Sequence, residues 1–197
     1  MKVVIPWSMV IGRAVMGPVL VAMTVWGVAG WVLSTIVVLT LVDDIADGML
    51  ARHWGTASPA LRLADSCADT VFYLGTAVAM WLRAPQTLRE NVYLIVVLFA
   101  LEAGRYVLDF AKFGKAASYH SYMAKAWALV LALAIVCVLA RGGPVWMVTV
   151  TAALGILVNL EGVAMSLLLP QWQNDVKTLG VAMRIRADSR RGGAVMR

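Results

Sequence analysis

The chain has 197 residues, of which 61% are hydrophobic and 14% are charged, whereas soluble domains contain about 45–50% apolar and about 25% charged residues. A chain this short cannot bury so much apolar surface in one core, so the composition argues against a water-soluble domain and indicates a membrane protein. The net charge is +6, but the basic residues are scattered without a recognition motif, which favours anionic lipid over nucleic acid as the counter-charge.

The apolar segments predict six membrane spans. No charged residue occurs between Ala14 and Val42, and one helix over 13–52 would be about twice as long as the hydrocarbon core is thick. We therefore expect two spans there, separated by a turn at Gly27 and Gly30, which lie beside interfacial tryptophans. The other spans are expected at 61–81, 91–110, 122–140 and 144–169.

The charges predict the orientation of these spans. On this layout, the basic residues opposite the termini are Arg83, Arg89 and Arg141, and the other Lys and Arg residues lie on the terminal side. Because cytoplasmic loops are rich in Lys and Arg, both termini are expected in the cytoplasm. The expected fold is all-α, an integral membrane bundle of about six transmembrane helices. It forms one domain over 1–170, followed by a basic cytoplasmic tail over 171–197 that lies in solvent or on lipid.

Four carboxylates lie at the inner ends of the second and third spans. Asp44 and Asp47 are three residues apart, and Asp65 and Asp69 are four apart, so each pair projects from one helix face. The short loop between the spans makes these helices antiparallel neighbours, and all four acids are expected to converge. Neighbouring carboxylates need cations, and hard oxygen donors suit Mg²⁺ or Mn²⁺. The spacing therefore predicts a site for two divalent ions, completed by a phosphate-bearing substrate.

Smaller features surround these acids. Interfacial charge at two helix ends would explain any one of the acids, but not both paired spacings. Asp43 points about 100° away from Asp44 around the helix and is expected behind the site or in solvent. Gly48 and Ala51 are small residues that let a ligand approach, and Arg52 offers a fork of donors to a phosphate.

The segment 44–69 resembles the signature of the CDP-alcohol phosphatidyltransferases, which reads DxxDGxxAR, eight residues, G, three residues, D, three residues, D. The matching residues are Asp44, Asp47, Gly48, Ala51, Arg52, Asp65 and Asp69. Leu61 stands where the family has glycine, so the packing near the nucleotide is expected to differ. The N-terminal Pro6, Arg13 and Pro18 also resemble the family's pattern.

This resemblance implies an enzyme of phospholipid synthesis. By position, the carboxylates would hold two ions of Mg²⁺ or Mn²⁺, and Asp69 would also act as general base. The small residues Gly48 and Ala51, with Arg52, would line the site for the CDP moiety. The base would take a proton from a small alcohol, which attacks the lipid-linked phosphate of CDP-diacylglycerol and expels CMP. The resemblance further implies a homodimer. The distribution of basic residues predicts a multi-pass protein of the inner membrane with its active site on the cytoplasmic side.

The loop between the fourth and fifth spans supplies candidate residues for the acceptor. Glu102, Arg105 and Asp109 form one helical stripe and are expected to pair with one another. Arg105, Lys115 and Lys125 are candidates for binding a phosphorylated alcohol. The resemblance makes glycerol 3-phosphate the first expectation, and inositol phosphate, free inositol, serine and choline stay open. Each lysine is explained equally well as a cytoplasmic loop residue.

Two other functions remain open at this point. The sequence DDIAD also satisfies the DDxxD pattern of prenyl-diphosphate enzymes, although membrane prenyltransferases are larger and carry their second aspartate motif far along the chain. A divalent-cation transporter would need acids distributed across the spans, whereas these acids cluster at one membrane face. Glu161 is alone in the sixth span and is expected to pair with a basic residue of a neighbouring helix.

Overall fold

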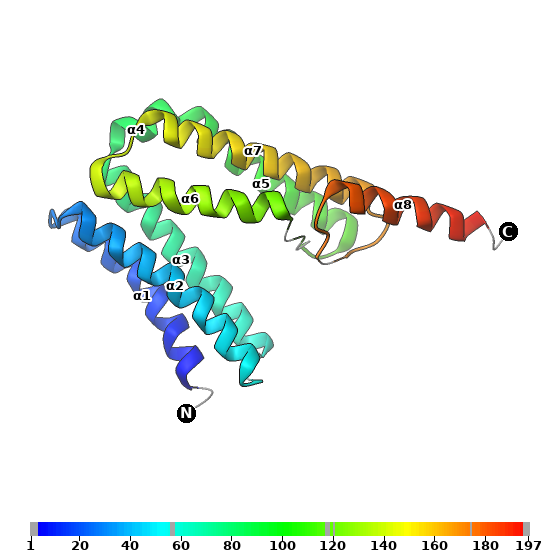
Figure 1. Ribbon diagram of the computed structural model, residues 1–197, viewed down its shortest axis with the longest axis horizontal. Helices are drawn as coiled ribbons and strands as arrows, with labels where there is room; N and C mark the ends of the chain where they lie inside the picture. Colours follow the sequence, from blue (N-terminus) through cyan, green and yellow to red (C-terminus); the bar gives the residue numbers. More distant parts are fainter. Residues whose placement is uncertain (1–3, 56–57, 117–118, 120, 174, 195–197) are drawn as a thin grey trace. The chain divides into compact units, whose positions relative to one another are not determined.

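A computed structural model describes residues 4–55, 58–116, 119, 121–173 and 175–194, and these ranges contain helices and no strand. The helices are α1 (Val4–Val25), α2 (Gly30–His53), α3 (Pro59–Arg83), α4 (Pro85–Glu90), α5 (Val92–Phe113), α6 (Tyr122–Arg141), α7 (Val145–Leu168) and α8 (Leu179–Ala194). The all-α prediction is therefore confirmed for the described residues (Figure 1).

The six longest helices correspond to the six predicted spans. The first two are separated where expected, because α1 ends at Val25, α2 begins at Gly30, and Gly27 between them has a φ of +74°, which glycine adopts without strain. Within the described residues, three helices are long and apolar enough to cross a membrane: α1, α6 and α7. The remaining spans and the cytoplasmic termini stay predictions. The short α4 and the helix α8 in the basic tail were not expected from the sequence.

The chain divides into two compact units. Unit 1 comprises residues 1–89 and 132–144, and unit 2 comprises residues 90–131 and 145–197. Unit 1 therefore contains α1 to α4 with the second part of α6, and unit 2 contains α5, the first part of α6, α7 and α8.

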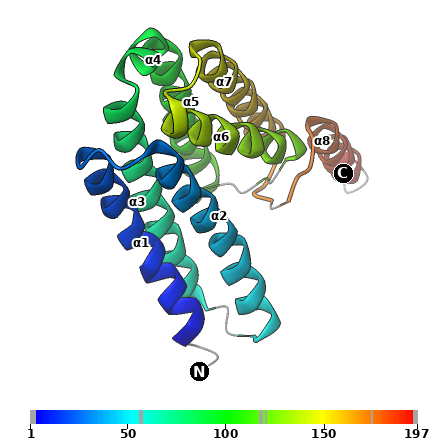
Figure 2. The same cartoon turned by 60° about the vertical axis from the view of Figure 1, so that its left-hand side comes forward.

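In unit 1, α1 packs against both α2 and α3 (Figures 1 and 2). The backbones of α1 and α3 approach closely at two glycines. A Cβ atom at Gly75 would lie 2.5 Å from the Gly17 oxygen, and one at Gly17 would lie 2.6 Å from the Val71 oxygen. Both distances are too short for a real Cβ, so glycine at these positions permits the contact. This contact fixes how α1 and α3 are aligned along their length.

The second part of α6 is tied to the rest of unit 1 by side chains that donate to its backbone oxygens. The Ser34 hydroxyl of α2 donates to the Val136 oxygen at 2.8 Å, and Arg83 Nε of α3 donates to the Leu139 oxygen at 3.3 Å. These bonds join the ends of α2 and α3 that lie away from the predicted acids, so they support the helix pair without entering the site.

In unit 2, α5 packs against α7, and a buried polar chain joins them. The Ser166 hydroxyl donates to Asp109 Oδ1 at 2.5 Å, and Tyr119 Oη lies 2.8 Å from the same Ser166 oxygen. Residues of the predicted tail pack on this unit, because Val176 and Ala182 are buried with Tyr119 and Met165 in one apolar cluster. The start of the tail is therefore part of the fold.

Candidate active site

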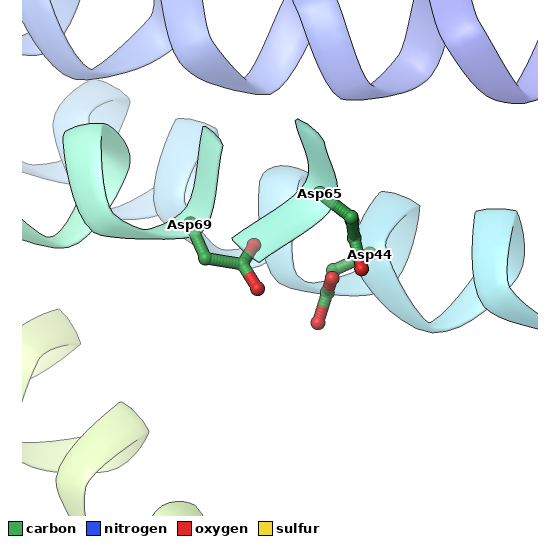
Figure 3. Close-up of side chains that lie close together, drawn as sticks. All are labelled: Asp44, Asp65 and Asp69. Atoms are coloured by element: carbon green, nitrogen blue, oxygen red, sulfur yellow. The ribbon is translucent and has the colours of Figure 1, made fainter. Parts of the chain in front are cut away.

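Three of the four predicted acids converge in unit 1. Asp44 projects from α2, and Asp65 and Asp69 project from α3 (Figure 3). One carboxylate oxygen from each lies within 4.8 Å of the others. The side chains of Asp44, Asp65 and Asp69 are 36%, 37% and 33% exposed, respectively. They therefore form a partly buried cluster of carboxylates that solvent can still reach.

The local sequence sets the start of α3 and thereby places its two acids. Ser58 lies immediately before the helix in an extended conformation, and its hydroxyl oxygen accepts the Leu61 N–H at 3.1 Å. Serine in this position, followed by proline in the first turn, is a strong helix start. Asp65 and Asp69 follow at a spacing that places both on one face, toward α2.

An arginine from α1 completes this cluster. Arg13 Nη1 lies 2.6 Å from Asp44 Oδ1, 2.7 Å from Asp65 Oδ1 and 2.6 Å from Asp69 Oδ1. Arg13 is only 2% exposed. The N-terminal pattern of Pro6, Arg13 and Pro18 does not by itself predict a role for Arg13 in the site. The available signal was an arginine inside an apolar segment, since such charges face the protein interior and pair there.

The donor set fits a hard divalent ion. Carboxylate oxygens are preferred ligands of Mg²⁺, and at about 2.1 Å from the ion, two ligands lie at most about 4.2 Å apart. The oxygens of Asp44, Asp65 and Asp69 are spread over up to 4.8 Å, so small side-chain rotations bring them to that separation. These three residues could therefore hold a metal ion.

Of the other residues in the predicted signature, the structure describes the side chain of Leu61 but not those of the matching residues in the DGxxAR segment. The side chains of Asp47, Gly48, Ala51 and Arg52 lie outside the part that the structure describes, so their roles stay predictions. Leu61 is 6% exposed and packs with Val10 of α1 and Ala68 of α3. The leucine at the glycine position of the signature therefore fills the space between α1 and α3.

A groove of about 510 Å³ lies between α1 and α2 beside the acids. Its polar part is formed by Ser8, Arg13 and Asp43, and its apolar part includes Met16 and Leu39. Because Met16 is about one helical turn beyond Arg13, the groove leads from the level of the carboxylates along the helices. Asp43 lines this groove, which agrees with the expectation that it points away from the other acids.

Comparison with known proteins identifies the family. The sequence model of CDP-alcohol phosphatidyltransferase matches residues 3–161. The chain belongs to the CDP-alcohol phosphatidyltransferase family. It is also 32% identical over 130 residues to a cardiolipin synthase (CMP-forming) of Streptomyces coelicolor. That alignment covers 64% of this chain and 57% of the relative, so the chain spans little more than half of the relative's length. No solved structure matches the chain.

The family match extends into unit 2, which holds a second cavity of about 320 Å³. Arg105 lines this cavity with Glu102. Its Nη1 lies 4.0 Å from Asp109 Oδ2, so the expected pairing within the stripe is observed for these two residues. Lys115 Nζ instead lies 3.5 Å from the centre of the Trp172 ring, and Lys125 is exposed. Among the acceptor candidates, Arg105 is thus the one that lines a described cavity.

Glu161 and Tyr119 also form side-chain hydrogen bonds in unit 2. Glu161 accepts a hydrogen bond from the Ser121 hydroxyl at 2.8 Å, where the sequence led us to expect a basic residue. Tyr119 also lines the cavity, and burial, with a smaller contribution from the Asp109 charge, raises the pKa of its hydroxyl. Tyr119 therefore keeps its proton and can donate to Ser166.

Proposed function

We propose that this chain transfers a phosphatidyl group from CDP-diacylglycerol to a small alcohol and releases CMP. The observation that carries the proposal is the convergence of Asp44, Asp65 and Asp69 in a chain of the CDP-alcohol phosphatidyltransferase family. When bound there, Mg²⁺ or Mn²⁺ would neutralise charge on the diphosphate and on the departing CMP. We propose two such ions, with Asp47 as a fourth ligand residue.

In the proposed reaction, Asp69 is the catalytic base. Its carboxylate accepts the proton of the alcohol, whose oxygen then bonds to the phosphorus that carries diacylglycerol. The bond between that phosphorus and the bridging oxygen of the diphosphate breaks, and CMP leaves with the bonding electrons. Gly48, Ala51 and Arg52 are proposed to bind the CDP moiety, where small residues admit the nucleotide and the guanidinium binds a phosphate oxygen.

The groove between α1 and α2 is the proposed place for the lipid part of the donor. It joins the polar level of Arg13 and Asp43 to an apolar stretch at Met16 and Leu39, as a diphosphate attached to acyl chains requires. A Cβ atom at Gly12 in this groove would meet nothing within 4 Å, and the same holds for Gly104 of α5 in unit 2. Gly12→Leu should therefore raise the KM for long-chain CDP-diacylglycerol, whereas Gly104→Leu should leave it unchanged. Equal KM values for the two variants would contradict binding of the donor lipid in this groove.

The proposed acceptor is glycerol 3-phosphate, with Arg105, Lys115 and Lys125 as candidate residues for its phosphate. A lipid acceptor is the second candidate, because the relative in Streptomyces coelicolor is named a cardiolipin synthase (CMP-forming). Cardiolipin contains two phosphatidyl groups joined by one glycerol, so its formation with loss of CMP requires phosphatidylglycerol as acceptor. The two candidates differ in whether the acceptor is soluble or membrane-bound.

The membrane arrangement is proposed with the function. Six spans, cytoplasmic termini and an active site on the cytoplasmic side of the inner membrane would place the carboxylates at the level of the lipid headgroups. The apolar helices α1, α6 and α7 support this arrangement. A homodimer is also proposed, and cross-linking in native membranes would test it.

The deciding experiment measures CMP release by the purified full chain in detergent. Labelled CDP-diacylglycerol is offered with Mg²⁺ or Mn²⁺ and a panel of alcohols that includes glycerol 3-phosphate and phosphatidylglycerol. We expect CMP only when both a metal and the correct alcohol are present. Asp69→Asn should abolish release, while Asp188→Asn, which changes an exposed acid of α8, should not.

The same preparation can decide against the proposal. Absence of CMP with every alcohol would contradict phosphatidyl transfer. Prenyl transfer from an isoprenoid diphosphate would instead support a prenyltransferase. Uptake of Mn²⁺ into liposomes without any CDP-lipid would support a cation transporter.

A further inference from the structure

One nitrogen atom of Arg13 lies among all three carboxylates. The oxygens of Asp44, Asp65 and Asp69 that approach Nη1 at 2.6–2.7 Å come from two different helices. An Nη atom carries two hydrogens, and these are donated to Asp65 and Asp69. Asp44 Oδ1 forms an ion pair with the same nitrogen. The guanidinium neutralises part of the repulsion between the three acids.

A metal ion ligated by these oxygens would need the same position. Oxygen ligands surround Mg²⁺ at about 2.1 Å, and the point that is close to all three carboxylates is filled by Nη1. Arginine stays protonated at every physiological pH, so deprotonation cannot remove its charge from the site. A divalent ion and the guanidinium cannot occupy this point together.

We propose that Arg13 is the internal counter-ion of the metal-free site and that the divalent ion binds by displacing its guanidinium from the carboxylates. The inference rests on the metal use in the proposed function. It makes Arg13 a positioning residue, which holds the three acids together before the ion arrives and competes with the ion for them.

The structure provides a place for the displaced side chain. Arg13 lines the groove between α1 and α2, together with Ser8 and Asp43. Rotation of the side chain into this groove would leave α1 where it is and bring the guanidinium toward the Asp43 carboxylate. In that position the guanidinium would also face the groove proposed for the donor, where it could bind an anionic phosphate oxygen.

The competition predicts an unusual effect of removing the arginine. A ligand residue that is lost weakens metal binding, whereas a competing cation that is lost strengthens it. Arg13→Met should therefore bind metal more tightly than the natural chain, although the metal-free protein loses the charge that holds its acids together. A purely structural role for Arg13 predicts weaker metal binding in the same variant.

The test titrates the full chain in detergent with Mn²⁺ alone and measures free Mn²⁺ by electron paramagnetic resonance. We expect Arg13→Met to lower the Kd for Mn²⁺ at least about tenfold, and to lower the metal-free Tm while increasing the rise in Tm that Mn²⁺ produces. Arg13→Lys keeps a positive charge and should stay close to the natural chain in its Kd. Arg141→Met, which removes an exposed arginine at the end of α6, should change neither quantity.

Each outcome supports or overturns the inference. An unchanged or higher Kd in Arg13→Met, or equal Kd values for Arg13→Met and Arg13→Lys, would overturn it. If Arg13→Met folds only when Mn²⁺ is present throughout purification, the ion has replaced the arginine and the inference is supported. Failure to fold even with Mn²⁺ would make Arg13 structural. Because no lipid is used, Mn²⁺ binding without CMP release counts against the proposed function and leaves this inference standing.

Discussion

The close contact between α1 and α3 allows a stability prediction with an internal control. Gly17→Ala places a Cβ atom 2.6 Å from the Val71 oxygen and 3.0 Å from the Phe72 Cα. Both neighbours are backbone atoms, which cannot rotate away as a side chain can. Gly12→Ala makes the same change in the same helix, at a position where the new atom meets nothing within 4 Å.

The size of the effect follows from these distances. Ordinary Cβ contacts begin at 3.4 Å, so the helices must separate locally by about 0.8 Å. Overpacking of this kind costs about 1–3 kcal/mol, while both substitutions gain up to about 1 kcal/mol in helix propensity. The gain in helix propensity is the same in both variants, so it does not affect the difference between their stabilities. Gly17→Ala is therefore expected to be less stable than Gly12→Ala by about 1–3 kcal/mol, or about 2–12 °C in Tm at this chain length.

The same shift should reach the candidate site. Arg13 precedes Gly17 by about one turn, and a separation of about 0.8 Å would stretch its 2.6 Å contact with Asp69 to about 3.4 Å, beyond the usual range of such bonds. Unfolding is followed by tryptophan fluorescence on heating, and the site by Mn²⁺ affinity. Melting of both variants within about 1 °C of each other would refute the reasoning, because the backbone contact would then be absent in solution.

Four further predictions concern Tyr119, Arg105 and the divalent metal. Tyr119→Phe should cost about 1 kcal/mol through loss of the bond to Ser166, while the same change at the exposed Tyr122 should stay within about 0.5 kcal/mol. Because burial raises the pKa of Tyr119, the unfolded chain loses this proton first, and the natural chain should lose Tm more steeply than Tyr119→Phe above about pH 10. Arg105→Met should raise the KM for the acceptor severalfold with little change in kcat, measured as CMP release, whereas Arg141→Met should leave both unchanged. Treatment with EDTA should stop CMP release and added Mn²⁺ should restore it; full activity in EDTA would contradict a divalent-metal mechanism.

Much of the fold was predictable because apolar runs and glycines define helices locally. The six long helices follow from hydropathy and helix length, and the turn at Gly27 follows from its glycines and flanking tryptophans. The helix α8 was not expected, since its residues read as a basic tail. Its Ala182 is buried in one apolar cluster with Met165 of α7, and no local pattern reveals this packing between distant segments.

The acids of the candidate site were predictable for a different reason. Asp44, Asp65 and Asp69 lie on two helices joined by a short connection, so sequence spacing is sufficient to bring them together. Arg13 reaches the same point from α1, and its alignment depends on the glycine contact between α1 and α3. The apolar surroundings of Arg13 indicate a buried, paired arginine, but spacing along the chain carries no information about which acids it meets.

The partner of Glu161 illustrates the same limit. A lone acid in an apolar helix suggests a basic partner, but the structure provides the Ser121 hydroxyl. Ser121 also accepts the Ala124 N–H at 3.1 Å at the start of α6, so one side chain serves both the helix start and the acid. A serine at a helix start is explained by capping alone, and its reach to Glu161 of α7 depends on helix packing.

Leu61 departs from the family signature, and its side chain contributes to the packing of α1 against α3. Glycine at this position of α3 would have no side chain, whereas Leu61 is buried in one apolar cluster with Val10 and Ala68. Any sliding of α3 along α1 would withdraw that side chain from its apolar cluster and expose it. Leu61 thus adds an apolar contact to the glycine contact that aligns α1, which carries Arg13, with α3, which carries Asp65 and Asp69.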